Sequence, residues 1–395
     1  MRRILLLLGW SPTLFAIAQD ASLVPGIRTE LAAATNDTLR ADALARLCFN
    51  LIHSDRDSAR LCGDQALALA TRIGNTRALG DAHNNLGWLE AVQGRLDSAD
   101  HHLDRALALF RKAGRPEHVA VTLSNKGWVA EKRGDQVGAL THFLEALTYS
   151  EQARDTASTS ILLYSIGIAY RKTNEHAQAL EFLERSAVLE RALGRTNKQA
   201  NCAVAIGNTH RELGDTTRAL EHLAQAAALY ASIGDHQGLG IVAENTGDLL
   251  SPSDADAALL AYRTARAHYD TLHSTTDLAY VLRSLGALYL RMGQVTDAAE
   301  ALRTGETLAH GTGDAELRMN YAFSLAELSR AQGDADGVFS RMERYLALKD
   351  SLQGADTQRE LARLRTTFDT ERKEKDNALL RAQNSEQAER IRRTR

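Results

Sequence analysis

The sequence predicts an all-α fold, an α-solenoid of about eight helix hairpins that repeat every 40 residues and end in a long charged helix. Two observations predict it. Proline occurs only 4 times in 395 residues, and a chain with so few helix-breaking residues is typical of helices joined by short turns. Glycine recurs at a constant spacing of 40 residues, at Gly87, Gly127, Gly167, Gly207 and Gly247, which is the signature of a repeat architecture.

The composition is that of a folded, soluble chain, with 44% hydrophobic and 25% charged residues. It therefore excludes wholesale disorder. The 47 Lys and Arg residues nearly balance the 50 Asp and Glu residues, for a net charge of −3. A general nucleic-acid binder has a strong basic excess, so we expect no nucleic acid among the partners.

Residues 1–18 have the layout of a secretory signal peptide. Arg2 and Arg3 form a positive start, an apolar stretch follows, and Ala16-Ile17-Ala18 has the small-x-small form of a cleavage site. We expect cleavage after Ala18 and export of the protein. The alternative is an uncleaved N-terminal membrane anchor.

Two further columns of small residues follow the glycine column at the same period. The first lies twelve residues after the glycines and comprises Ala59, Ala99, Ala139, Ala179, Ala219, Ala258 and Ala298. The second comprises Ala66, Ala106, Ala146, Ser186, Ala226, Ala265 and Gly305. Between the columns, apolar residues recur at three- and four-residue steps, as at Leu140, Phe143, Leu144 and Leu147, which places them on one helix face. Small residues let two antiparallel helices approach closely, so the columns predict the helix contacts.

Tight turns are predicted between the two helices of each repeat. Glycine and asparagine tolerate the left-handed conformation that ends a helix. They recur between the glycine and alanine columns at Gly94, Gly134, Asn174, Gly214, Gly293 and Gly333. Each repeat is therefore expected to be a helix, a short turn and a second helix.

This pattern resembles the tetratricopeptide repeat family. The resemblance is carried by units such as Leu123-Ser124-Asn125-Lys126-Gly127-Trp128, followed by Gly134-Asp135 and Ala139-Leu140. It implies a repeat array over residues 39–350, preceded by a capping helix within residues 19–38. The family's repeats have about 34 residues, so the 40-residue period implies longer helices or longer linkers.

The C-terminal residues 351–395 are expected to form a charged, mostly solvated helix. From residue 355 onward there are 11 Lys and Arg and 8 Asp and Glu residues, with no glycine or proline. A thin apolar stripe at Leu361, Leu364 and Phe368 allows a short coiled coil, which would make a homodimer through residues 355–391. The alternative is a charged helix that packs only its start against the last repeat.

A narrower resemblance is to the extracytoplasmic repeat regions of bacterial sensor histidine kinase-like proteins of the Bacteroidetes type. Tyr345-Leu346-Ala347-Leu348-Lys349-Asp350 and Phe368-Asp369-Thr370-Glu371-Arg372-Lys373 look like the junction after their repeats. The resemblance implies a periplasmic input region of a two-component-type signalling protein, anchored by a membrane span that would follow this sequence and lead to an output module, a kinase or a helix-turn-helix regulator. The alternative is a complete, soluble periplasmic scaffold without an output module.

The sequence has no motif for catalysis or for a cofactor. It lacks a glycine loop for phosphates, HExxH and G-x-S-x-G, so we expect neither an enzyme nor a cofactor. His102, His142 and His222 form a column. Equivalent points of stacked hairpins lie roughly 10 Å apart, too far for one metal ion with ligands at about 2 Å.

The three cysteines, Cys48, Cys62 and Cys202, specify no disulfide. We expect them to be ordinary helix-face residues. A bond between Cys48 and Cys62 is the pairing left open, because both fall on one predicted hairpin.

The family resemblance implies that the first helices line a concave groove for a protein or peptide ligand. The side chains that would face this groove are Asn84, Trp88, Ser124, Trp128, Glu131, Tyr164, Ile168, Arg171, Asn208 and Arg211. Trp88 and Trp128 have two interpretations. They either contact the ligand, since tryptophan is enriched at binding hot spots, or seal the gap between two first helices.

Overall fold

The computed structural model describes residues 21–353. These residues are helical and contain no strand, which confirms the all-α fold class. The predicted signal peptide at 1–18 and all but the first three residues of the predicted charged helix at 351–395, including the predicted dimer segment 355–391, lie outside the described residues. The chain divides after Thr209 into two compact units, which are described separately.

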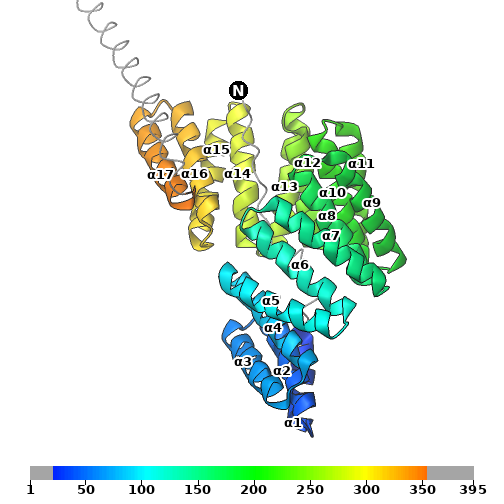
Figure 1. The fold of residues 1–395 in the computed structure, drawn as a ribbon. Coiled ribbons are helices and arrows are strands. Elements are labelled where there is room, and N and C mark those ends of the chain that lie inside the picture. Colours follow the sequence, from blue (N-terminus) through cyan, green and yellow to red (C-terminus); the bar gives the residue numbers. More distant parts are fainter. Residues whose placement is uncertain (1–20, 354–395) are drawn as a thin grey trace, which may run out of the picture. The chain divides into compact units, whose positions relative to one another are not determined.

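The first unit contains a short 3-10 helix, η2, at Ala21–Leu23, and a leading helix, α1, at Val24–Ala33. Its hairpin helices are α2 (Asp37–Leu51), α3 (Arg56–Ile73), α4 (Thr76–Val92), α5 (Leu96–Lys112), α6 (Pro116–Lys132), α7 (Gln136–Gln152), α8 (Thr156–Lys172) and α9 (His176–Ala192). Most of α10 (Thr196–Glu212) also belongs to this unit. Within each hairpin the two helices pack side by side, as α6 and α7 do in Figure 1.

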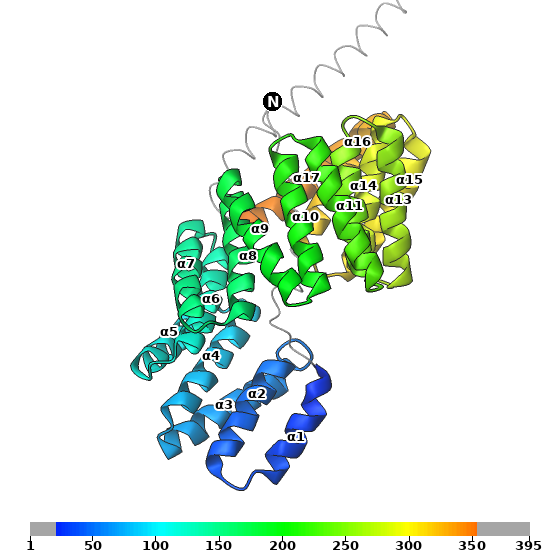
Figure 2. The ribbon, with the colours of Figure 1, turned by 90° about the vertical axis from the view of Figure 1, so that its right-hand side faces the viewer.

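The second unit contains the end of α10 and seven complete helices. These are α11 (Thr216–Ser232), α12 (His236–Leu250), α13 (Ala255–Thr271), α14 (Thr275–Arg291), α15 (Val295–Gly311), α16 (Ala315–Ala331) and α17 (Ala335–Gln353). α12 packs on α13, α14 on α15 and α16 on α17 (Figure 2). The predicted hairpins are therefore present in both units.

The 40-residue period arises from long helices and not from long linkers. In α6 through α9 each helix has 17 residues, and three residues separate it from the next. The shorter spacing between Gly247 and Gly286 has a local cause. α12 has only 15 residues, and Pro252 follows its C-terminus, where it lacks the N–H needed to continue the helix.

Gly134 and Asp135 together turn the chain between α6 and α7. Gly134 adopts a φ of 82°, and its N–H donates to the carbonyl of Glu131 at 2.9 Å, which ends α6 in the left-handed conformation. The Asp135 carboxylate accepts a hydrogen bond from the N–H of Gly138 at 2.8 Å and so caps α7. Every turn glycine predicted above has a positive φ, and so does Asn174, at 63°.

The glycine column makes room for a large side chain of the second helix. At Gly127, an added Cβ would overlap the ring of Phe143. Phe143 is fully buried in a cluster with Ala139 and Ala146. The small columns thus allow the close helix approach that the sequence predicts, with the large side chains of α7 filling the remaining space.

The first helices of the first unit form a continuous layer. The backbones of α2 and α4, of α4 and α6, and of α6 and α8 approach closely, whereas successive second helices are joined by longer contacts, such as the ion pair between Arg111 of α5 and Glu145 of α7. Because successive first helices lie closer together than successive second helices, the stack of hairpins in this unit is narrower on the first-helix side. The family geometry implied the same inner face.

Candidate peptide-binding face

The two tryptophans of the predicted groove pack against each other. Trp88 on α4 and Trp128 on α6 are only 8% and 9% exposed, and their ring centroids lie 4.8 Å apart with an edge-to-face angle of 63°. The ammonium of Lys132 lies 4.9 Å from the Trp128 ring. This geometry favours the interpretation in which both rings seal the gap between first helices, while contact with a ligand stays a prediction.

Asn84 joins α4 to α6 by hydrogen bonds. Its carbonyl oxygen accepts from the Thr122 hydroxyl at 3.2 Å and from the Asn125 amide at 3.1 Å. Ser124, between them on α6, is half-buried. These neutral polar groups are the donors and acceptors that a peptide backbone can use.

Glu131 forms an ion pair with Lys172 on the next first helix. The two groups are 3.0 Å apart, and the side chains are 4% and 19% exposed. Burial raises the pKa of Glu131, and the Lys172 charge acts in the opposite direction. Burial also lowers the pKa of Lys172, again opposed by its partner. The pair is therefore largely withdrawn from water and ties α6 to α8.

Tyr164 and Ile168 belong to a small apolar cluster. Ile168 is buried with Leu183 and Ile206, and the ring of Tyr164 packs against this cluster. Burial raises the pKa of Tyr164, and the charge of Arg171 acts against that rise. Arg171 itself is half-buried on α8. Tyr164 and Arg171 lie on the same helix, about two turns apart.

Asn208 is the last predicted groove residue of the first unit. Its side chain is buried, and within residues 21–353 its carbonyl oxygen has no hydrogen-bond partner. Arg211 lies in the second unit, where its guanidinium is 3.8 Å from the Asp248 carboxylate. Asp248 also accepts a hydrogen bond from the Tyr262 hydroxyl at 2.7 Å.

Glu244 carries the largest carboxyl pKa shift of the second unit's first helices. The Tyr269 hydroxyl donates to it at 3.1 Å. Burial, helped by the negative charge of Asp248, raises the pKa of Glu244 to about 8. Tyr262 and Tyr269, which hold these two acids, were not among the predicted site residues.

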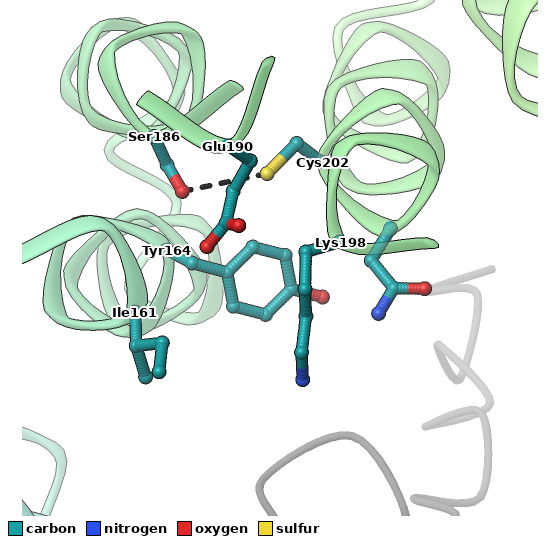
Figure 3. Close-up of a pocket in the computed structure, with 7 residues that line it drawn as sticks. Ile161, Tyr164, Ser186, Glu190, Lys198 and Cys202 are labelled. Atoms are coloured by element: carbon teal, nitrogen blue, oxygen red, sulfur yellow. Dashed lines mark hydrogen bonds between the residues drawn. The ribbon is translucent and has the colours of Figure 1, made fainter. Parts of the chain in front are cut away.

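A pocket between α8, α9 and α10 is a second feature that sequence reasoning missed. Figure 3 shows Tyr164 of α8, Glu190 of α9 and Lys198 of α10 around it. The missed signal is a repeat column in which Glu190 occupies the place of Phe110 and Tyr230. A carboxylate is exceptional at a position that is otherwise aromatic or small.

The histidine column does not gather at one point. His102 approaches His83 of its own hairpin, with the two Nδ1 atoms 3.0 Å apart, and His222 stacks on His210. Within residues 21–353 no group of three or more His, Cys, Asp or Glu side chains is arranged to hold a metal ion. Cys48, Cys62 and Cys202 are free thiols.

Each helix within residues 21–353 is too short or too polar to span a membrane.

Comparison with known proteins supports the repeat assignment. Residues 81–152, which comprise most of α4 and all of α5, α6 and α7, match the family model described as tetratricopeptide repeat. No curated protein sequence matches the chain.

Several solved structures share the fold at low sequence identity. The apo form of RapI is 12% identical, over 79% of this chain and 87% of that one, with a TM-score of 0.62. Aspartyl phosphate phosphatase F from Bacillus subtilis is 14% identical, over 73% and 75%, with a TM-score of 0.53. The Rap conjugation gene regulator of plasmid pLS20, solved with the Phr* peptide, is 14% identical, over 80% and 85%, with a TM-score of 0.52.

These likenesses concern the fold, and the family match concerns four helices. Together with the hairpin geometry they lead to one conclusion: residues 81–152 match the tetratricopeptide repeat family, and each of the two units is built from successive all-α helix hairpins of this type.

Proposed function

We propose that the first helices of the first unit bind a peptide or an extended segment of another protein. The observation that carries this proposal is the layer formed by α2, α4, α6 and α8, which presents half-buried polar groups at equivalent positions, as at Asn84, Ser124 and Tyr164. Neighbouring helices pack about 8–10 Å apart and an extended chain rises about 3.3 Å per residue. About three peptide residues would therefore span one repeat.

The structures with a similar fold support a peptide as the class of ligand. The regulator of plasmid pLS20 was solved with a peptide, and repeat solenoids commonly bind extended segments on such faces. The chemistry of the face suits a peptide, since its amides and hydroxyls can pair with backbone groups and the Tyr164 ring offers an apolar contact.

The test begins with peptides selected from a displayed library against the full chain. Ser124→Arg puts a long charged side chain on the first-helix face and should weaken the selected peptide at least about tenfold. The matched control is Val188→Arg on α9, where the native side chain is 63% exposed. Equal affinity of both variants and the parent, with helix content unchanged by circular dichroism, contradicts the proposal.

The setting we propose is an exported input region of a membrane-anchored, two-component-type signalling protein. It is supported by the basic and apolar start of the chain, by Ala16-Ile17-Ala18, and by the charged segment 351–395. A ligand that favours one arrangement of the repeats would shift the population of that arrangement, and the charged segment would pass the change on, with 355–391 pairing two copies.

This setting has its own test. Mass spectrometry of the protein from the periplasmic fraction should find a mature chain that begins at Gln19. A full-length product whose reading frame continues into an apolar run of about 20 residues would support membrane anchoring. Recovery of the protein only in the cytoplasmic fraction, with Met1 retained, contradicts export.

A further inference from the structure

The pocket of Figure 3 lies between two successive first helices of the first unit. Ile161 and Tyr164 contribute from α8, Lys198 and Cys202 from α10, and Glu190 closes it from α9. The empty space among these residues, counted out into open solvent, is about 300 Å³, and its enclosed part has room for about one water-sized group, such as an amide NH₂. Tyr164 is also one of the predicted groove residues, so the pocket adjoins the proposed peptide-binding face.

The α9 wall of the pocket differs from the equivalent position in two other repeats. Glu190 belongs to a repeat column that also contains Phe110, Ser150 and Tyr230. Phe110 and Tyr230 are buried rings. Phe110 packs over Gly80, where an added Cβ would overlap its ring. In the α8–α9 hairpin a carboxylate replaces the ring, and Ser160 lies opposite it. A carboxylate fills less space than a ring and adds a charge to the wall.

Glu190 has one satisfied and one unsatisfied oxygen. The side chain is 2% exposed, and its Oε1 accepts a hydrogen bond from the Ser160 hydroxyl at 2.6 Å. Within residues 21–353 its Oε2 is buried without a hydrogen-bond partner, and the Arg195 guanidinium is 3.9 Å away, beyond hydrogen-bond reach. Buried polar atoms are nearly always paired, so Oε2 is the place where a ligand can supply a donor.

The surrounding charges select the kind of donor. The positive charges of Arg195 and Lys198 both interact with the Glu190 carboxylate. These two charges would repel a third cation. A neutral donor avoids this repulsion. A primary amide offers an NH₂ group to Glu190 Oε2 and a carbonyl oxygen to the Lys198 ammonium, which also lines the pocket. Tyr164 provides a flat wall for the amide plane.

We infer that this pocket receives the primary amide side chain of a glutamine or asparagine from the peptide on the first helices. The inference rests on the proposed function, because the peptide backbone would lie on that face. The inference adds a sequence preference to the proposed function. Glu190 would accept a hydrogen bond from the side-chain amide of the peptide, and Lys198 would donate one to it.

The experiment uses a small probe, so that it needs no selected peptide. N-acetyl-glutamine N-methylamide is titrated into the full chain carrying ¹³C-labelled tyrosine, and the Tyr164 signal, assigned with Tyr164→Phe, is followed by NMR. The glutamine probe should shift this signal in a saturable way. The matching norleucine probe, which lacks the amide, and the lysine probe, which carries a cation, should each bind at least about tenfold more weakly.

Two variants separate binding from folding. Glu190→Gln keeps the size and removes the charge, and it should weaken the glutamine probe about tenfold or more. Glu190→Tyr restores the ring found at Tyr230, and it should abolish probe binding while the melting temperature stays equal or rises. Tyr230→Phe, outside the pocket, is the control and should leave probe binding unchanged.

Several results would overturn the inference. They are an unshifted Tyr164 signal at saturating probe, tighter binding of the lysine probe, or a crystal soaked in the glutamine probe that holds only water at Glu190. If a selected peptide still binds the Glu190→Tyr variant with parental affinity, the first-helix face stands as the peptide site and the pocket does not. Probe binding without any peptide binding would instead contradict the proposed function.

Discussion

The rings of Trp88 and Trp128, one full repeat apart in sequence, meet edge to face with their centroids 4.8 Å apart. Removing either ring should therefore destabilise the first unit by about 3–5 kcal/mol, the usual range for a buried tryptophan replaced by alanine. The double variant should lose less than the sum by about 0.5–1.5 kcal/mol, since the aromatic contact is counted twice. Urea unfolding followed by circular dichroism measures all three.

Val137→Ala on α7 is the control for the tryptophan variants. Val137 is 76% exposed, so its loss should change stability by no more than about 0.5 kcal/mol. A loss below about 1 kcal/mol for both tryptophan variants, together with lost peptide binding, would assign the rings to the ligand instead of to packing.

Gly127→Ala should destabilise the α6–α7 hairpin by about 1–3 kcal/mol. The added Cβ would overlap the Phe143 ring, and such overpacking forces the ring or the helices to shift. The same substitution at Gly26 in α1, where no atom lies within 4 Å of the new Cβ, should instead stabilise by up to about 1 kcal/mol through helix propensity. Thermal unfolding of both variants checks the difference, and equal effects at the two sites would contradict the close approach.

Glu244 should make the stability of the second unit fall as pH rises. Its pKa is raised from 4.5 to about 8 by burial and by the charge of Asp248. Between these two values the unfolded chain has released the proton and the folded chain still holds it. The unfolded state therefore binds fewer protons there, and the free energy of unfolding decreases with pH.

Glu244→Gln should flatten this dependence, because the amide keeps an acceptor for the Tyr269 hydroxyl and has no proton to lose. Urea midpoints at about pH 5 and about pH 8 measure the slope across the window set by the shifted pKa. Glu221→Gln, at an exposed position on α11, is the control and should keep the parental slope. An unchanged slope in Glu244→Gln would mean that this carboxyl does not titrate in the window.

Lys172→Met should destabilise the first unit by up to about 3 kcal/mol, because it leaves the Glu131 carboxylate buried without its partner. Adding Glu131→Leu should recover most of the loss, since an apolar pair of similar size needs no counter-charge. Arg111→Met breaks the exposed pair with Glu145 and should cost less than about 1 kcal/mol. Identical losses in the single and double variants at Glu131 and Lys172 would contradict a buried pair.

The periodic small residues predicted the hairpins because close helix packing leaves a direct trace in sequence. Gly127 faces Phe143 in the structure, and Gly134 ends α6, as their columns indicated. The sequence left open whether longer helices or longer linkers made up the 40-residue period. That choice depends on where each helix ends, and a single residue such as Asp135 as helix cap decides it.

The candidate face was predictable by position but not by exposure. The column through Trp88 and Trp128 was expected to lie on the groove side, with ligand contact and gap sealing both left open, and the tightness of the first-helix layer buries both rings. That tightness depends on contacts between repeats, which no single column reveals. Glu190 lies outside the columns of small residues, so their periodicity does not point to it. Its own column, which includes Phe110, Ser150 and Tyr230, identifies it once the aromatic members are compared.

Hydrogen exchange of the full chain, with and without a library-selected peptide, would show which helices the peptide covers. We expect slower exchange along α4, α6 and α8, the first helices that contact one another in sequence order. We expect little change along α5, α7 and α9 on the opposite side. Protection confined to the second helices, or no protection at saturating peptide, would contradict the claim that the first-helix layer is the binding face.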